Sequence, residues 1–136
     1  MDKVWDWKWM SNPVRADGGG MGLDPGRASI DISRPGVYVI YEDNVSAKTA
    51  VYVGKSDESV FDRMNSHCSE KEKDENYGLY KFIHDRMQAN YYVLLGGDAE
   101  DRSDYERTLY EVYGGKEVLF NREQPEGSYI DMVRPF

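Results

Sequence analysis

The chain has 136 residues, of which 25 are acidic and 17 are basic, and its formal net charge is −8. A chain of this length is expected to fold as one domain and to bury roughly two thirds of its unfolded surface without metal or disulfide support. The single cysteine, Cys68, excludes an internal disulfide, and the acidic balance excludes a broad basic surface for a nucleic acid backbone.

The sequence carries no membrane or export signal that we can identify. No apolar run approaches the roughly 20 residues of a transmembrane helix, and the first residues lack the layout of a secretory signal. We therefore expect a cytoplasmic protein without a membrane partner. A nucleic acid partner would have to be held by a local basic patch, a metal ion or a second subunit. The alternative is that the acidic surface serves solubility alone.

Residues 1–35 form an extension with irregular patterning. Trp5, Trp7 and Trp9 alternate with charged residues, which predicts a strand with one aromatic face. This face could stack on nucleic acid bases, but we favour packing against the rest of the protein, because three exposed indoles leave a large apolar surface in water. Residues 17–26 form a glycine-rich loop that lacks the GK[ST] ending of a phosphate-binding P-loop.

Residues 36–136 have the regular patterning of a folded body. Two β-rich runs, 37–41 and 50–53, are joined by a polar loop and predict a hairpin. A helix follows, with Ser56 or Asp57 as its cap. Its apolar residues, spaced for one buried stripe, are Val60, Phe61, Met64 and Cys68.

The rest of the body alternates between helices and one strand. The charged tract 69–76 predicts a solvated loop. Further elements are expected as a helix at about 78–88, a buried strand at 91–95, a helix at about 103–113 and a short edge strand at 128–133. The order predicts an α/β (α+β) fold, in which a small three-stranded, mainly antiparallel sheet is flanked by helices.

Several side chains in this order suit phosphodiester hydrolysis. Arg63 and His67 are four residues apart on the first helix, so both point toward one spot. An arginine can clamp a phosphate through its planar fork of donors, and a single glutamate such as Glu106 can hold a Mg²⁺ ion that keeps several waters. Together they would neutralise the phosphate oxygens and stabilise the leaving oxygen.

The same residues belong to a longer ordered set of motifs. It comprises Gly36-Val37-Tyr38, Tyr52-Val53-Gly54, Lys55, Arg63, His67, Glu106 and Asn121. This set resembles the GIY-YIG nuclease family over about residues 36–122, with valine in place of isoleucine in both name-giving motifs. The first 35 residues lie outside the resemblance and could supply recognition or a dimer contact.

The resemblance implies a metal-dependent endonuclease that cuts DNA with one divalent ion, Mg²⁺ or Mn²⁺, and leaves 5′-phosphate and 3′-hydroxyl ends. It implies Glu106 as the metal ligand and Tyr38 or Tyr52 as the general base, with neighbouring positive charge favouring the phenolate. His67 would be a second acid/base or a phosphate ligand. The residues expected to bind substrate or organise the site are Gly54, Lys55 and Asn121.

Each of these residues also has a purely structural interpretation. Ser103 and Glu106 match the S-x-x-E capping box, in which the carboxylate would serve a helix start. The two tyrosines could be ordinary strand aromatics. Arg63 could pair with a surface carboxylate, a contact worth little, and His67 could be a surface residue.

Two further functions remain open at the level of the sequence. A catalytically inactive protein could use the same scaffold to bind a protein partner, with its acidic surface mimicking DNA. Alternatively, the enzyme could act on RNA or a small nucleotide, for which a basic groove matters less. A homo-oligomer or a protein partner could compensate for the acidic surface in either case.

Overall fold

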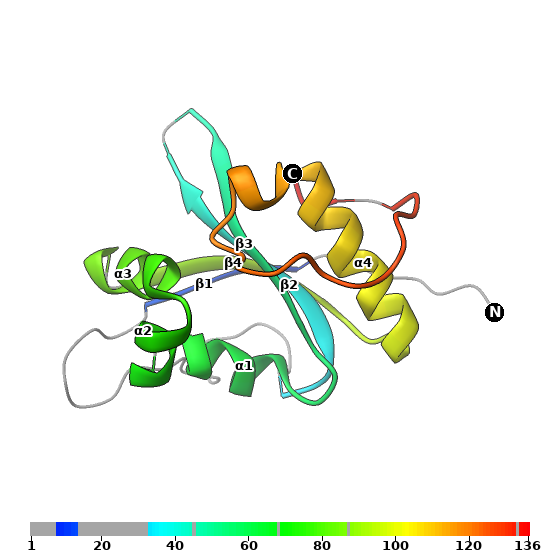
Figure 1. Cartoon of the computed structure of the whole chain (residues 1–136), viewed down its shortest axis with the longest axis horizontal. Helices are drawn as coiled ribbons and strands as arrows, with labels where there is room; N and C mark the ends of the chain where they lie inside the picture. The colour runs from blue at the N-terminus through cyan, green and yellow to red at the C-terminus, as the bar shows by residue number, and fades with distance from the viewer. Residues whose placement is uncertain (1–7, 14–32, 45, 68, 87, 133) are drawn as a thin grey trace.

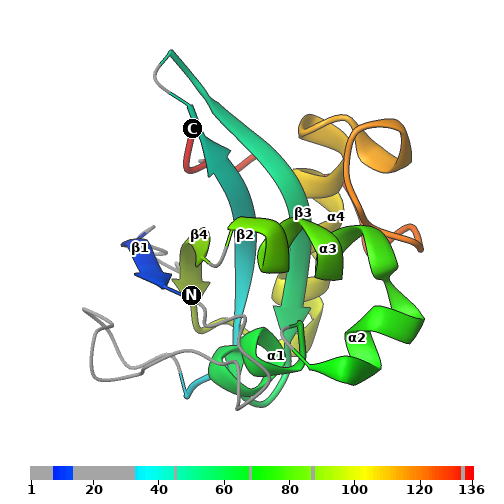
Figure 2. The ribbon, with the colours of Figure 1, turned by 90° about the vertical axis from the view of Figure 1, so that its left-hand side faces the viewer.

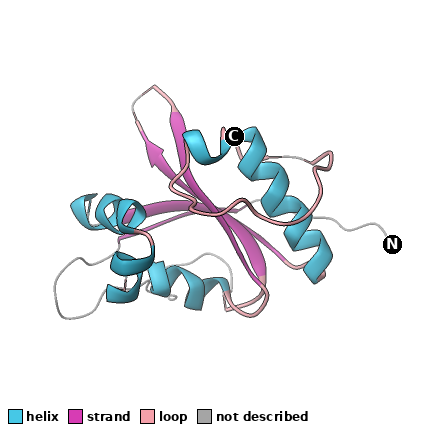
Figure 3. Cartoon of the chain, in the orientation of Figure 1, coloured by secondary structure: helices cyan, strands magenta, loops and turns pink. Residues whose placement is uncertain are grey.

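The computed structural model describes residues 8–13, 33–44, 46–67, 69–86, 88–132 and 134–136. Within them a mixed α+β domain is formed by an antiparallel sheet with helices on both faces (Figures 1 and 3). This confirms the predicted fold class at that level. No helix in these ranges has the length and apolar character needed to span a membrane.

The sheet has the strand order β1-β4-β2-β3, and every neighbouring pair is antiparallel. Its strands are β1 (Lys8–Pro13), β2 (Gly36–Asp43), β3 (Lys48–Ser56) and β4 (Gln88–Leu95). The three strands expected in the body are present, and β1 from the N-terminal extension adds a fourth. Figure 2 shows β1 at one margin of the sheet and β3 at the other. The predicted tryptophan strand overlaps β1 at Trp9, whereas Trp5, Trp7 and the glycine-rich loop lie outside the described residues.

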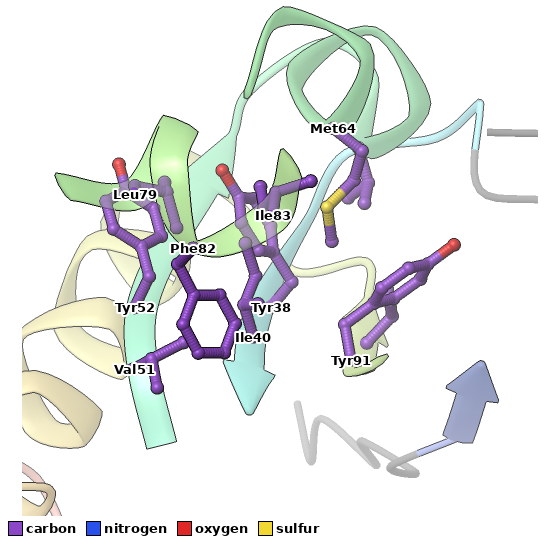
Figure 4. Packing of buried hydrophobic residues seen from close by; sticks show 11 residues of the cluster. Tyr38, Ile40, Val51, Tyr52, Met64, Leu79, Phe82, Ile83 and Tyr91 are labelled. Carbon is purple, nitrogen blue, oxygen red and sulfur yellow. The ribbon is translucent and has the colours of Figure 1, made fainter. Parts of the chain in front are cut away.

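The period of two in β2 divides the core into two clusters. Tyr38 and Ile40 point toward helices α1 (Val60–His67) and α3 (Tyr77–Arg86), whereas Val37 and Val39 point toward α4 (Ala99–Val112). All four side chains are fully buried. Figure 4 shows the first cluster, in which Tyr38 and Tyr52 lie side by side on adjacent strands. Cys68, expected in this core, lies outside the described residues.

The charged tract after α1 was expected to be a loop, and this is wrong. It contains helix α2 (Glu70–Glu75). Its glutamates and lysines have high helix propensity, and Lys71 and Glu75 form an i,i+4 pair at 3.6 Å. The tract is also not wholly solvated, because Glu72 is only 6% exposed.

Helix α4 begins one turn earlier than predicted. Asp98 is its N-cap, and the side chains of Asp98 and Asp101 form a reciprocal capping box. Ser103 and Glu106 therefore lie inside the helix, and the interpretation of Glu106 as a capping residue is wrong. The cap of α1 also differs from the prediction, because Ser59 Oγ accepts the hydrogen bond from Asp62 N at 3.2 Å.

The tail that follows α4 and the short 3₁₀ helix η2 (Gly115–Glu117) runs back along α4. The edge strand predicted at 128–133 is wrong, since no strand is assigned to its described residues. Its backbone instead bonds to side chains of α4, with Ser128 N donating to Asp104 Oδ1 and Ile130 N donating to Thr108 Oγ1, both at 2.9 Å.

Candidate functional site

A pocket with a volume of about 820 Å³ gathers residues from β3, α1, α2, α4 and the segment after η2. Five of the eight side chains expected at the site line it, namely Tyr52, Lys55, Arg63, Glu106 and Asn121. The remaining three, Tyr38, Gly54 and His67, lie directly behind this lining, each in contact with another member of the set.

Tyr52 is the phenol that lines the pocket. Its side chain is 9% exposed, and burial raises its pKa to about 12, although the nearby charge of Arg63 acts in the opposite direction. The sequence led us to expect that nearby positive charge would favour the phenolate. In the protein without bound ligands, desolvation outweighs that charge, so the Tyr52 hydroxyl is protonated at neutral pH.

Tyr38, His67 and Glu72 form a buried chain of polar contacts behind Tyr52. The Tyr38 hydroxyl is 2.5 Å from His67 Nε2, and His67 Nδ1 is 3.4 Å from Glu72 Oε2. Tyr38 is fully buried and His67 is 1% exposed, so the interpretation of His67 as a surface residue is wrong. Burial raises the pKa of Tyr38 well above its ordinary value and lowers the pKa of His67, so both groups are neutral at pH 7.

Gly54 leaves the space that the Tyr38 hydroxyl occupies. A Cβ added at Gly54 would overlap this hydroxyl and would lie 2.5 Å from Tyr38 Cζ. The absence of a side chain on β3 therefore lets the Tyr38 ring reach His67. Gly54 therefore positions Tyr38, and its expected role in substrate binding stays a prediction.

Glu106 projects from the middle of α4, is partly buried and lines the pocket. Burial raises its pKa from 4.5 to about 7, and the positive charges of Lys55 and Arg63 only partly oppose this. In the described part of the chain, no hydrogen bond or ion pair satisfies its carboxylate. A carboxylate with these properties fits one hard divalent cation, which commonly takes only one or two protein carboxylates and keeps several waters. No cluster of three or more metal-binding side chains occurs among the described residues.

Lys55 is held at the pocket by a small ionic network. Its Nζ is 2.9 Å from Asp57 Oδ2, and Asp57 Oδ1 accepts a hydrogen bond from Arg102 Nε at 3.0 Å. Arg102 also donates to the carbonyl oxygens of Gly96 and Gly97. The network joins the end of β3 to the start of α4, one turn before Glu106, and so fixes Lys55 relative to that carboxylate.

Asn121 fastens the segment after η2 to β3. Its Oδ1 accepts from Val53 N at 3.0 Å, and its Nδ2 donates to Val53 O at 2.7 Å. Next to it, Phe120 N donates to Val51 O at 2.7 Å. Asn121 thus organises one wall of the pocket through backbone contacts.

Three residues that contribute to the site were missed in the sequence. Glu72 was hidden within a charged tract, and nothing in the spacing of that tract indicates its burial. Asp57 was considered only as a helix cap, and Arg102 was not considered. The D-x-x-D spacing of Asp98 and Asp101 is a sequence signal for a helix that starts at about residue 99. With this start, Arg102 and Glu106 lie four residues apart on the same helix and therefore on one face of it.

Comparisons with protein families, curated proteins and solved structures found no significant match to this chain. Any functional assignment therefore depends on the residues of the pocket.

Proposed function

We propose that this protein is a metal-dependent endonuclease of the GIY-YIG type that hydrolyses phosphodiester bonds in DNA. The observation that supports the proposal best is that four side chains from three elements, Tyr52, Lys55, Arg63 and Glu106, line one pocket. A phenol, two cations and a partly buried carboxylate are groups that a phosphodiester-cleaving site can use for positioning, charge neutralisation and metal binding.

Lys55 and Arg63 are assigned to the phosphate group. Arg63 lines the pocket while remaining exposed, so its planar fork can contact two phosphate oxygens. Lys55 offers a point charge that is shared with Asp57 in the free protein. Together they neutralise the non-bridging oxygens on which charge accumulates during displacement.

Glu106 is assigned as the ligand of one Mg²⁺ or Mn²⁺ ion. When bound, such an ion supplies positive charge to the phosphate and to the leaving oxygen. Glu106 must be ionised to serve as a ligand, and its pKa of about 7 means that proton release accompanies binding at neutral pH. Its position within the helix interior, away from the cap of α4, leaves the carboxylate free for this role.

The two phenols are assigned different roles. Tyr52 lines the pocket and, as a neutral phenol, donates a hydrogen bond that orients water or phosphate. Tyr38 is hydrogen-bonded to neutral His67, which can accept its proton. We therefore assign proton acceptance to the pair of Tyr38 and His67. Glu72 lines the pocket and approaches His67, so it connects this buried pair to pocket water.

A binding module for a protein partner is the second candidate, and the composition of the pocket favours it. The pocket has three basic lining residues against five acidic ones, namely Glu72, Glu75, Glu106, Glu123 and Glu126. Such a surface could bind a cationic protein by mimicking DNA. An enzyme that acts on RNA or a small nucleotide stays a further alternative, because such a substrate needs less of a basic groove than long duplex DNA.

The proposal is tested by incubating the protein with plasmid, single-stranded DNA and RNA in the presence of Mg²⁺ or Mn²⁺. We expect cleavage that depends on the metal and is lost in Glu106→Ala and Arg63→Ala. Glu100→Ala is the matched control, because Glu100 is exposed on the same helix as Glu106. Cleavage that survives both pocket substitutions would refute the assigned site. The absence of cleavage of any substrate by the wild-type protein would favour the binding module.

A further inference from the structure

Glu72 is the one acidic residue of α2 that the fold buries. It is 6% exposed, whereas Glu70, Asp74 and Glu75 on the same helix are exposed. Burying a carboxylate costs free energy unless a partner compensates for it. Its Oε2 faces His67 Nδ1 at 3.4 Å, with side-chain exposures of 7% and 1% for Glu72 and His67. The burial of Glu72 beside His67 indicates that its carboxylate interacts with the imidazole ring and not with solvent.

The opposite nitrogen of His67 already has a partner. Nε2 is 2.5 Å from the Tyr38 hydroxyl, whereas Nδ1 is fully buried, makes no hydrogen bond among the described residues and has Glu72 Oε2 at 3.4 Å. A neutral imidazole carries one proton, so one ring nitrogen donates and the other accepts. Because an ionised carboxylate can only accept, a proton on Nδ1 would satisfy Glu72 and leave Nε2 to accept from Tyr38.

We propose that Glu72 is a positioning residue that holds His67 in the Nδ1–H tautomer, with Nε2 accepting the Tyr38 hydroxyl proton. Proton transfer from Tyr38 to Nε2 is unfavourable in the free protein, where burial keeps both groups neutral. When it occurs, it leaves a phenolate and an imidazolium whose Nδ1–H faces Glu72. The charge of Glu72 stabilises that imidazolium. The tautomer is inferred from the two contacts of the imidazole ring, with Tyr38 at Nε2 and Glu72 at Nδ1, whereas its catalytic use depends on the proposed nuclease function.

The tautomer is measured directly by long-range proton–nitrogen NMR of the imidazole rings in ¹⁵N-labelled protein. The chain contains two histidines, and His84 serves as an internal reference because its Nδ1 lies 2.9 Å from the Tyr80 carbonyl oxygen. In the wild-type protein we expect a protonated Nδ1 and an unprotonated Nε2 on His67. A wild-type His67 that carries its proton on Nε2 would overturn the proposal, whether or not any variant folds.

Two substitutions on α2 test the cause. In Glu72→Ala we expect the Nε2–H tautomer of His67 to become populated, while the signals of His84 stay unchanged. Asp74→Ala is the matched control, since it removes an exposed carboxylate of the same helix that does not line the pocket. An unchanged His67 spectrum in a folded Glu72→Ala protein would overturn the assigned role.

Cleavage assays on the same variants separate this inference from the proposed function. If the wild-type protein cleaves nucleic acid, we expect Glu72→Ala to lower the rate by about tenfold or more, because general acid–base catalysis contributes roughly 10²–10⁴. We expect Asp74→Ala, which lies outside the pocket lining, to leave the rate within about twofold of wild type. If neither the wild-type protein nor any variant cleaves a substrate, the nuclease proposal fails. The tautomer assignment is then still decided by the NMR measurement alone. A wild-type rate in Glu72→Ala would overturn the catalytic part.

Discussion

Replacement of Glu106 by glutamine is expected to stabilise the fold at alkaline pH. Burial raises the pKa of the Glu106 carboxyl from 4.5 to about 7, so the folded protein holds this proton more tightly than the unfolded chain. The neutral Glu106 carboxyl therefore makes its full contribution to the free energy of unfolding below about pH 4.5, and this contribution is lost as the pH rises through 7. Glutamine has nearly the same shape and cannot ionise, so the substitution removes the penalty.

The size of this effect follows from the same pKa values. A change from 4.5 to about 7 corresponds to about 3 kcal/mol at pH 8, since one pKa unit is worth about 1.4 kcal/mol. For a chain of 136 residues this amounts to a rise of about 10 °C in the melting temperature. The gain should fall steadily between pH 7 and pH 5 and be nearly absent at pH 4.5.

The assay is thermal and urea unfolding of both proteins from pH 4.5 to 8.5, with Glu100→Gln as the exposed control on the same helix. Added Mg²⁺ should stabilise the wild-type protein at pH 8 and leave Glu106→Gln unaffected, because only the carboxylate serves as a ligand. A variant no more stable than wild type at pH 8 would contradict the idea that burial opposes the charge of Glu106. Equal stabilisation of both proteins by Mg²⁺ would place the ion elsewhere.

Three other substitutions test the framework of the site by urea unfolding. Gly54→Ala should cost about 1–3 kcal/mol, since its Cβ would overlap the Tyr38 hydroxyl, and a near-neutral value would contradict the tight packing. Asn121→Ala should cost about 2 kcal/mol, because it leaves the N–H and C=O of Val53 without their partner; unchanged stability would mean that water replaces the amide. Arg102→Lys should cost about 1–3 kcal/mol, because lysine cannot reproduce the guanidinium fork, and a cost below about 0.5 kcal/mol would show that charge alone suffices.

The body of the fold could be predicted because local patterns determine it. The alternation along β2 places Tyr38 and Val39 on opposite faces, and the glycine pair after β4 marks the end of that strand. Tyr52, Lys55, Arg63 and Glu106 lie on predicted strands and helices, and the fold brings these elements to one pocket. The i,i+4 spacing of Arg63 and His67 predicts that both point toward one spot, and in the structure Arg63 lines the pocket while His67 lies behind it against Tyr52.

Other features depend on contacts between distant residues, and no local pattern reveals them. Asn121 meets Val53 across 68 positions, and its two hydrogen bonds depend on how the segment after η2 returns to the sheet. The burial of Glu72 follows from its approach to His67, not from its charged neighbours. The raised pKa of Tyr52, about 12 in the protein without a metal, has a related cause, because a sequence shows nearby cations but not the extent of desolvation.

The attachment of Phe120 and Asn121 to β3 affects how this protein can associate with other chains. A strand at the border of a sheet normally offers unpaired backbone groups that recruit a foreign strand, which is a common route to aggregation. Here Val51 and Val53 already use three outward hydrogen bonds within the molecule. A strand from another chain would have to displace these hydrogen bonds before it could pair with β3. The edge of the sheet beside the pocket is therefore protected against edge-to-edge aggregation, while the pocket itself remains accessible.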